Sequence, residues 1–110
     1  MATYIPEKAD LVKIEGNTFD IIITFPTILD LSLFDEIILQ IRNAGVLLVQ
    51  KLLSDGTIIR TGQKITAKFT ENDTLGKAGE HKWEIEFRND TPEVITGCYG
   101  SIKINSKLII

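Results

Sequence analysis

Apolar and polar residues alternate with a period of two along much of this chain. The clearest run, residues 79–88 (GEHKWEIEFR), alternates between two sets of side chains: His81, Trp83, Ile85 and Phe87 against Lys82, Glu84, Glu86 and Arg88. Successive side chains of a β-strand point to opposite faces of a sheet, so this run predicts a strand with one buried and one solvated face. A turn at residues 89–92 then predicts a returning strand over residues 94–104.

The same pattern predicts more short strands upstream, over residues 11–15, 18–25, 34–43, 46–53 and 63–70. Residues 46–53 (VLLVQKLL) also suit a helical spacing, but their length and the flanking turns favour a strand with both sides buried. Asp55-Gly56 predicts a type I′ hairpin turn, and residues 43–45 predict another turn. Residues 71–79 are expected to cross between sheets as a helical turn or loop that Leu75 holds in place.

Seven or eight short strands with turns every few residues indicate an all-β fold, either an antiparallel sandwich or a barrel. No alternation of strands with helices is visible, which argues against a parallel sheet. The 110 residues fit a single domain, residues 1–110, with a short N-terminal arm (Met1–Asp10) and a C-terminal tail (Lys107–Ile110).

Composition narrows the possible partners and compartments. A net charge of −3 and a pI near 5.1 disfavour binding to nucleic acid or to anionic membranes. No apolar run approaches the roughly 20 residues of a membrane span, and the N-terminus lacks the pattern of a secretory signal. Because Cys98 is the only cysteine, neither an internal disulfide nor a four-cysteine zinc site can form. The chain is therefore expected to fold in a reducing cytoplasm.

Few residues qualify as catalytic candidates. His81 shares the inward face of its strand with Trp83, and it would need a nucleophile and a carboxylate beside it. None of the serines occupies a nucleophile-elbow sequence: Ser32, Ser54, Ser101 and Ser106. Nothing near Cys98 in sequence would lower its pKa. We therefore expect His81 at the rim of the sandwich, Cys98 as a small packed hydrophobe, and no enzymatic activity.

Ligand and metal sites are equally hard to find. Trp83 could stack on a ligand, but its place on an inward face favours a role in filling the core. Three acidic pairs lack the oxygen-rich loop of a calcium site and are expected to be solvated: Asp35 with Glu36, Glu71 with Asp73, and Glu84 with Glu86. The glycines form no phosphate-cradling pattern. We expect no cofactor and no metal.

Two features suggest contact with another subunit. Ile22 and Ile38 interrupt otherwise polar strand faces, and the tail ends in Leu108, Ile109 and Ile110. Exposed apolar groups of this kind often mark an interface. The tail could equally complete a terminal strand within its own domain, and the sequence leaves both possibilities open.

Several segments resemble a known family, the immunoglobulin-like sandwich domains of tailed-bacteriophage structural proteins, such as the N-terminal domains of baseplate upper proteins. The similar segments are GNTF (16–19), DLS…F…QIR (30–42), the DG turn (55–56), KITAKFT (64–70), TLGKAGEHKWEIEF (74–87) and the closing G.I.I pattern of Gly100, Ile102 and Ile104. The resemblance covers most of residues 16–104. It implies an immunoglobulin-like β-sandwich and a virion protein without catalytic residues.

The family members continue into a fibre or receptor-binding region, whereas this chain ends where the domain ends. We therefore expect a multicopy auxiliary, decorating or adaptor subunit that docks on major capsid, tail, collar or fibre proteins. It would be assembled in the cytoplasm of the host bacterium and carried in the virion. Met1–Asp10 and Lys107–Ile110 are the first docking segments to test.

Two alternatives remain open. A carbohydrate-binding module would need aromatic side chains on an outward face, for which Tyr99 and Tyr4 are the candidates. A small hydrolase would need a nucleophile paired with His81.

Overall fold

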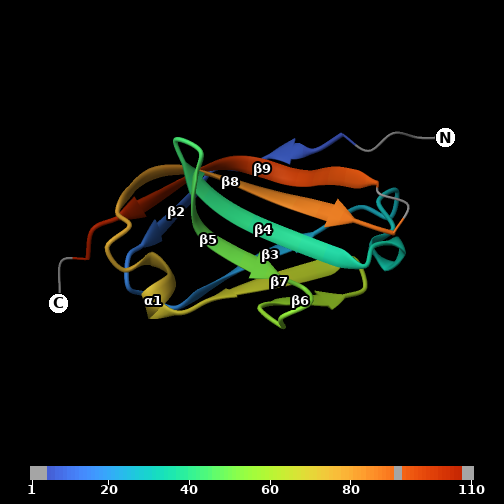
Figure 1. The fold of residues 1–110 in the computed structure, drawn as a ribbon, viewed down its shortest axis with the longest axis horizontal. Coiled ribbons are helices and arrows are strands. Elements are labelled where there is room, and N and C mark those ends of the chain that lie inside the picture. The colour runs from blue at the N-terminus through green and yellow to red at the C-terminus, as the bar shows by residue number, and fades with distance from the viewer. Residues whose placement is uncertain (1–4, 91–92, 108–110) are drawn as a thin grey trace.

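Two β-sheets face each other in the computed structural model, which describes residues 5–90 and 93–107 (Figure 1). The larger sheet has six strands in the order β1-β9-β8-β4-β5, with β2 also paired to β9, and the smaller has the order β3-β7-β6. The strands are β1 (Glu7–Lys8), β2 (Leu11–Ile14), β3 (Phe19–Thr24), β4 (Glu36–Asn43), β5 (Val46–Leu52), β6 (Ile58–Thr61), β7 (Lys64–Phe69), β8 (Gly79–Arg88) and β9 (Val94–Asn105). A 3₁₀ turn η1 (Leu31–Leu33) and one helical turn α1 (Glu71–Thr74) connect them.

The expected all-β sandwich is confirmed, with two differences in detail. The described residues contain nine strands because two were not predicted: β1, which lies in the expected N-terminal arm, and β6. Both β1 and β2 run parallel to β9, whereas the other strand pairs are antiparallel. The sheet therefore joins the beginning of the chain to its end. The immunoglobulin-like topology stays a prediction.

The core forms where the inward faces of the two sheets meet. Period-two alternation correctly predicted these faces, since the inward residues of β4, β7 and β8 are buried: Ile37, Leu39, Ile41, Ile65, Ala67, Phe69, Trp83, Ile85 and Phe87. Phe87 packs edge-on against Phe25, with ring centroids 5.1 Å apart, and against Phe34 at 5.3 Å. Edge-to-face packing of aromatic rings adds to the area that each ring buries.

The type I′ hairpin turn lies at Ala44-Gly45 and not at Asp55-Gly56. Ala44 and Gly45 have φ values of 50° and 82°, and they join the paired strands β4 and β5. Asp55 has no positive φ. Its carboxylate instead accepts from the backbone N–H of Thr57 at 2.9 Å, in a turn that carries the chain from the larger sheet to the smaller one. The Asp55-Gly56 hairpin prediction was therefore wrong. The two residues do form a turn, but the strands before and after it belong to different sheets, which the turn residues alone do not indicate.

The strand over residues 46–53 is confirmed as β5, but the prediction that both sides are buried was wrong. Val49 is buried on the inward face, whereas Val46 and Leu47 are exposed near the hairpin turn. The helical turn after β7 is also confirmed, although Leu75 does not hold it, since that side chain is 59% exposed. Thr74 anchors the turn instead: it is fully buried, and its hydroxyl accepts from the Gly16 N–H at 3.0 Å.

Candidate interaction surface

Trp83 lies in the interior, as the sequence predicted. The indole is 2% exposed, and its Nε1–H donates to the Ala9 carbonyl at 2.8 Å. Gly100 is the cross-strand partner of Trp83, and a Cβ at that position would come within 1.8 Å of the same carbonyl oxygen. The N-terminal strand can therefore reach the indole only because residue 100 has no side chain. Trp83 serves as an internal anchor for this strand and is not available as an outward stacking platform.

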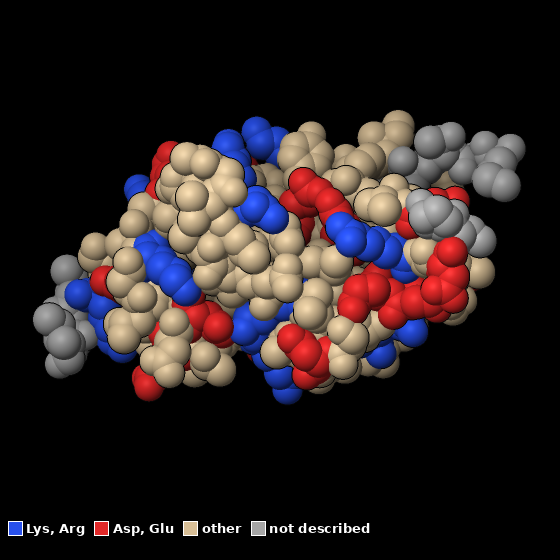
Figure 2. Space-filling model, in the orientation of Figure 1, with Lys and Arg blue, Asp and Glu red and all other residues tan. Residues whose placement is uncertain are grey.

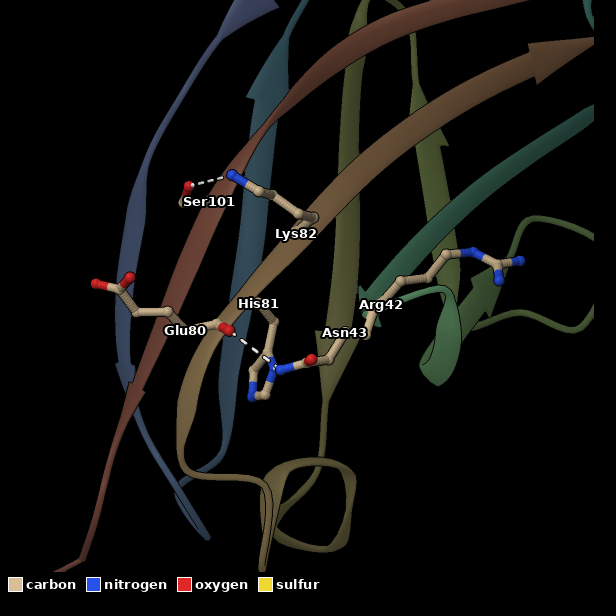
Figure 3. A pocket seen from close by; sticks show the side chains of 7 residues that line it. Arg42, Asn43, Glu80, His81, Lys82 and Ser101 are labelled. Carbon is tan, nitrogen blue, oxygen red and sulfur yellow. Dashed lines mark hydrogen bonds between the residues drawn. The ribbon is translucent and has the colours of Figure 1, made fainter.

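His81 is buried at one end of β8, beside a hollow of about 230 Å³ (Figure 3). Its Nε2 lies 2.7 Å from the Lys77 carbonyl, which can only accept, so Nε2 carries the proton. Its Nδ1 then accepts from the Asn43 amide at 2.9 Å, and the same amide donates to the Glu80 carbonyl at 3.3 Å. Both ring nitrogens are thus engaged in contacts that tie β8 to β4 and to the segment that follows α1.

The hydroxyl nearest to this hollow belongs to Ser101, which does not meet His81. Ser101 lies on the other face of the sheet, where it accepts from Lys82 at 3.4 Å (Figure 3). Ser32 bonds Asp30, while the backbone N–H of Ser54 bonds Glu36. The nucleophile–histidine pair that a hydrolase requires is therefore not formed at His81 among the described residues.

Cys98 packs as a small hydrophobe, as predicted, and is 5% exposed. Burial raises the pKa of its thiol, and a hydrogen bond from the Tyr99 backbone only partly opposes that effect. The thiolate is the reactive form of cysteine, so a raised pKa leaves this side chain a poor nucleophile at neutral pH.

The acidic pairs were expected to be solvated, but one carboxylate of each of the first two pairs is bonded within the fold. Asp73 accepts from Lys51 Nζ and from the Thr70 N–H, both at 2.6 Å. Glu36 accepts from the backbone N–H groups of Ile37 at 3.0 Å and Ser54 at 3.1 Å. Within residues 5–90 and 93–107, no group of three or more His, Cys, Asp or Glu side chains could hold a metal ion.

Glu84 and Glu86 belong to the charged outward face of the larger sheet, over a shallow hollow of about 340 Å³. Burial, then the hydrogen bond and charge of Glu86, raises the pKa of Glu84. A hydrogen bond from Arg88, at 2.9 Å, lowers the pKa of Glu86 against the effect of burial. Arg42 and Lys82 line the same hollow. Figure 2 shows acidic and basic side chains intermixed over the middle and right of the molecule.

The β4–β5 hairpin provides the apolar part of this region. Val46 is 61% exposed and Leu47 is 42% exposed, and we call these two residues together with Ala44 the hairpin tip. Leu47 is the cross-strand partner of Arg42, so the tip borders the charged face directly. In Figure 2 the hairpin forms a broad uncharged area at the upper left. This patch was not predicted from the sequence, because the apolar run of residues 46–53 favoured a strand with both sides buried. The predicted turn at residues 43–45 was the available signal, since strand ends beside a hairpin turn often project beyond the facing sheet.

Of the two isoleucines expected to contact another subunit, one is exposed and the other is buried. Ile22 is 59% exposed, as expected, but Ile38 is only 9% exposed because it sits centrally between β5 and β8. Most of the N-terminal arm is built into the sheet, since β1 pairs with β9 and the Ala9 N–H donates to the Tyr99 carbonyl at 2.8 Å. Residues 1–4, including Tyr4, and the tail residues 108–110 lie outside the described residues.

Fold and surface together define a two-layer β-sandwich with a charged outward face and an apolar hairpin tip. No protein-family model matches the chain, and no similar protein was found among the curated proteins. The described part of the chain has no helix of the length and apolar character needed to cross a membrane.

Proposed function

We propose that this protein is a noncatalytic virion subunit of a tailed bacteriophage that decorates or adapts the particle by protein–protein contact. Its partners are other virion proteins, such as major capsid, tail, collar or fibre subunits. The single observation that carries this proposal is the hairpin tip, in which exposed Leu47 is the cross-strand partner of Arg42 and Arg42 in turn is the partner of Lys82. An apolar centre with a polar rim is the usual composition of a protein interface.

The strand order supports the immunoglobulin-like part of this proposal. A sheet ordered β3-β7-β6 facing one ordered β9-β8-β4-β5 corresponds to strands B-E-D and G-F-C-C′ of a variable-type immunoglobulin sandwich. In that correspondence the hairpin tip lies at the C–C′ turn. Because many folds of this type bind partners through loops and edge strands, the proposed contact uses an ordinary feature of the architecture.

The test is co-sedimentation of the tagged chain with phage particles that assemble in its presence. Leu47→Asp places a charge at the centre of the hairpin tip, and we expect it to lower incorporation by about tenfold or more, as for a buried interface residue. Leu33→Asp is the matched control, because Leu33 is also exposed, at 65%, but belongs to η1. Equal incorporation of wild type and Leu47→Asp would remove the hairpin tip from the proposal. Absence of the wild-type chain from all particles would remove the virion role.

A carbohydrate-binding module is the second candidate, and Tyr99 favours it. The ring is 43% exposed on the outward face of β9, directly opposite Glu84 and beside Lys8. Aromatic rings beside polar groups bind sugars, and Glu84, the cross-strand partner of Tyr99, also lines the hollow on the outward face. Binding on a glycan array that Tyr99→Ala abolishes and Leu47→Asp preserves would favour this candidate over the first.

A further inference from the structure

Three of the four sheet edges carry a feature that discourages pairing with another chain. Short strands, inward-pointing charges and bulges are the usual protections. At one edge of the larger sheet, β1 and β2 have only 2 and 4 residues. At its other edge, β5 points the buried Lys51 inward and its pairing with β4 contains a register shift. In the smaller sheet, β6 has 4 residues, and its Arg60 donates to the carbonyls of Leu31 and Phe34 at 2.8 Å each.

The fourth edge, β3, lacks all of these protections. It has 6 residues in continuous register with β7, and Asp20 is its only charged residue. It contains no proline, since Pro26 comes after the strand ends. Ile22, at its centre, is 59% exposed on the outward face of the sheet. This edge is therefore the one most suited to receive another strand.

The backbone groups on the open side of β3 can be assigned from one hydrogen bond. The Phe25 N–H donates to the Gln63 carbonyl at 2.8 Å, so residue 25 directs its backbone groups toward the β7 side. Successive residues of a strand direct these groups to opposite sides. The N–H and C=O groups of Asp20, Ile22 and Thr24 consequently point to the open side. Among the described residues, β3 pairs with no strand other than β7.

We propose that β3 pairs antiparallel with β3 of a second copy of this chain, about a two-fold axis at Ile22. Ile22 then lies opposite the partner's Ile22, and Asp20 lies opposite the partner's Thr24. Every N–H and C=O group that Asp20, Ile22 and Thr24 present at the edge finds a partner in this arrangement. The proposal concerns a contact between copies and does not depend on the proposed virion role.

The chain's own residues select this register over its neighbours. Directly opposed residues of antiparallel strands point their side chains to the same face of the sheet. If both copies keep their cores on the same side, an outward residue must therefore oppose an outward residue. The two-fold axis must then lie where a residue opposes its own copy. An axis at Ile21 would set the Asp20 carboxylate against Ile22 and leave Thr24 without a strand partner. An axis at Ile23 would oppose Asp20 with Pro26, which has no N–H to donate. The axis at Ile22 avoids both conflicts.

Side chains on the outward face are complementary in the same register. Ile22, Thr66 and Ile59 form a row across the sheet, and pairing at β3 joins this row to its copy. The flanking rows place Lys68 beside Asp20 and Lys64 beside Thr24. In the dimer this row reads Lys68 and Asp20 of one chain, then Thr24 and Lys64 of the second copy. No like charges oppose each other directly, and the hydroxyl of Thr24 faces the Asp20 carboxylate across the new strand pair.

A contact through one six-residue edge is small, so we expect a concentration-dependent equilibrium and not a permanent dimer. Sedimentation velocity of the full chain, from micromolar to millimolar concentration, should show monomer passing to dimer. Ile22→Lys sets two like charges face to face and should weaken dimerisation by about tenfold or more. Ile59→Lys is the matched control, because Ile59 lies in the same row, 43% exposed, but on the opposite edge strand. It should leave the dimer unchanged.

A second variant reports the register itself. Hydrogen-bonded residue pairs in antiparallel strands have Cα atoms about 5.5 Å apart, which a disulfide can span. Ile22→Cys should therefore form a covalent dimer on mild oxidation, whereas Ile59→Cys should not. A wild-type chain that stays monomeric at millimolar concentration would overturn the proposal. So would a dimer that survives Ile22→Lys, or one that Ile22→Lys and Ile59→Lys weaken equally, since the contact would then lie elsewhere.

Discussion

At the scale of single residues, the most specific feature is the contact between Trp83, Ala9 and Gly100. These residues are distant in sequence, yet the indole N–H, the Ala9 carbonyl and the missing Cβ of Gly100 depend on one another. A buried indole N–H without an acceptor would cost about 1–3 kcal/mol. The N-terminal strand supplies that acceptor, which explains why it runs along β9.

Gly100→Ala tests this contact. The added methyl group would meet the Ala9 backbone, so the N-terminal strand must shift and the indole must lose its acceptor. We expect the free energy of unfolding, measured by urea denaturation, to fall by about 2–4 kcal/mol. Ser101→Ala, one residue along β9, should change it by less than about 0.5 kcal/mol. A Gly100→Ala protein as stable as wild type would show that the close approach is not required.

At the scale of elements, the ion pair between Lys51 and Asp73 connects the edge strand β5 of the larger sheet to the helical turn α1. Lys51 is 5% exposed, and its Nζ lies 5.0 Å from the centroid of the Phe69 ring as well as 2.6 Å from Asp73. Burial opposes ionisation of Asp73, but hydrogen bonds from Lys51 and the Thr70 N–H outweigh it and lower the pKa of this carboxyl below 3.8. Asp73 thereby couples β5 to α1 through side chains.

This lowered pKa predicts how stability depends on pH. A carboxyl whose pKa is lower in the folded state stabilises the fold above its unfolded pKa, near 3.8, and loses that effect as the pH falls through its folded pKa. Asp73→Asn should therefore lower the free energy of unfolding by about 1–3 kcal/mol at pH 7, with the difference from wild type shrinking below pH 3.8. Urea denaturation of the variant and the wild type measures this difference in unfolding free energy at pH 7 and at low pH. The exposed Asp35→Asn is the control, and a difference that grew on acidification would contradict the assignment.

At the scale of the whole molecule, the beginning and the end of the chain form one edge of the larger sheet. In Figure 1, β1 follows β9 along the upper edge, and β2 lies further left, beside the end of β9. Residues 5–10 are consequently part of the fold, so deletion of the entire arm Met1–Asp10 would not isolate a docking segment.

Two truncations separate these roles. Removal of residues 1–10 deletes β1 and the Ala9 carbonyl, so we expect a red shift of the Trp83 fluorescence and a loss of about 2–4 kcal/mol in unfolding free energy. Removal of residues 1–4 keeps β1 and Ala9 and is the matched control. Identical behaviour of the two truncated chains would mean that the β1 contacts contribute nothing measurable.

Most strand positions and their inward faces could be predicted from the sequence, because alternation is a local property of an extended chain. The interior residues of β4 and β8 could be assigned from spacing alone: Ile37, Leu39, Ile41, Trp83, Ile85 and Phe87. The sequence also showed the lack of a recognisable catalytic motif. The predictions were wrong where one local signal is compatible with two structures. At Asp55-Gly56, for example, the same turn residues can close a hairpin or carry the chain from one sheet to the other.

Which sheet edges are open and which apolar residues are exposed could not be predicted from the sequence, because both depend on how the strands are arranged in space. Ile22 and Ile38 have the same local pattern, yet Ile38 is covered by strands on both sides while Ile22 lies on an edge strand. Likewise, nothing near Gly100 in sequence indicates that Ala9 lies against it. These properties depend on strand order and on contacts between distant segments. An alternating pattern carries no information about strand order or about contacts between distant segments. The hairpin tip and the open β3 edge, the two proposed contact surfaces, both depend on these properties.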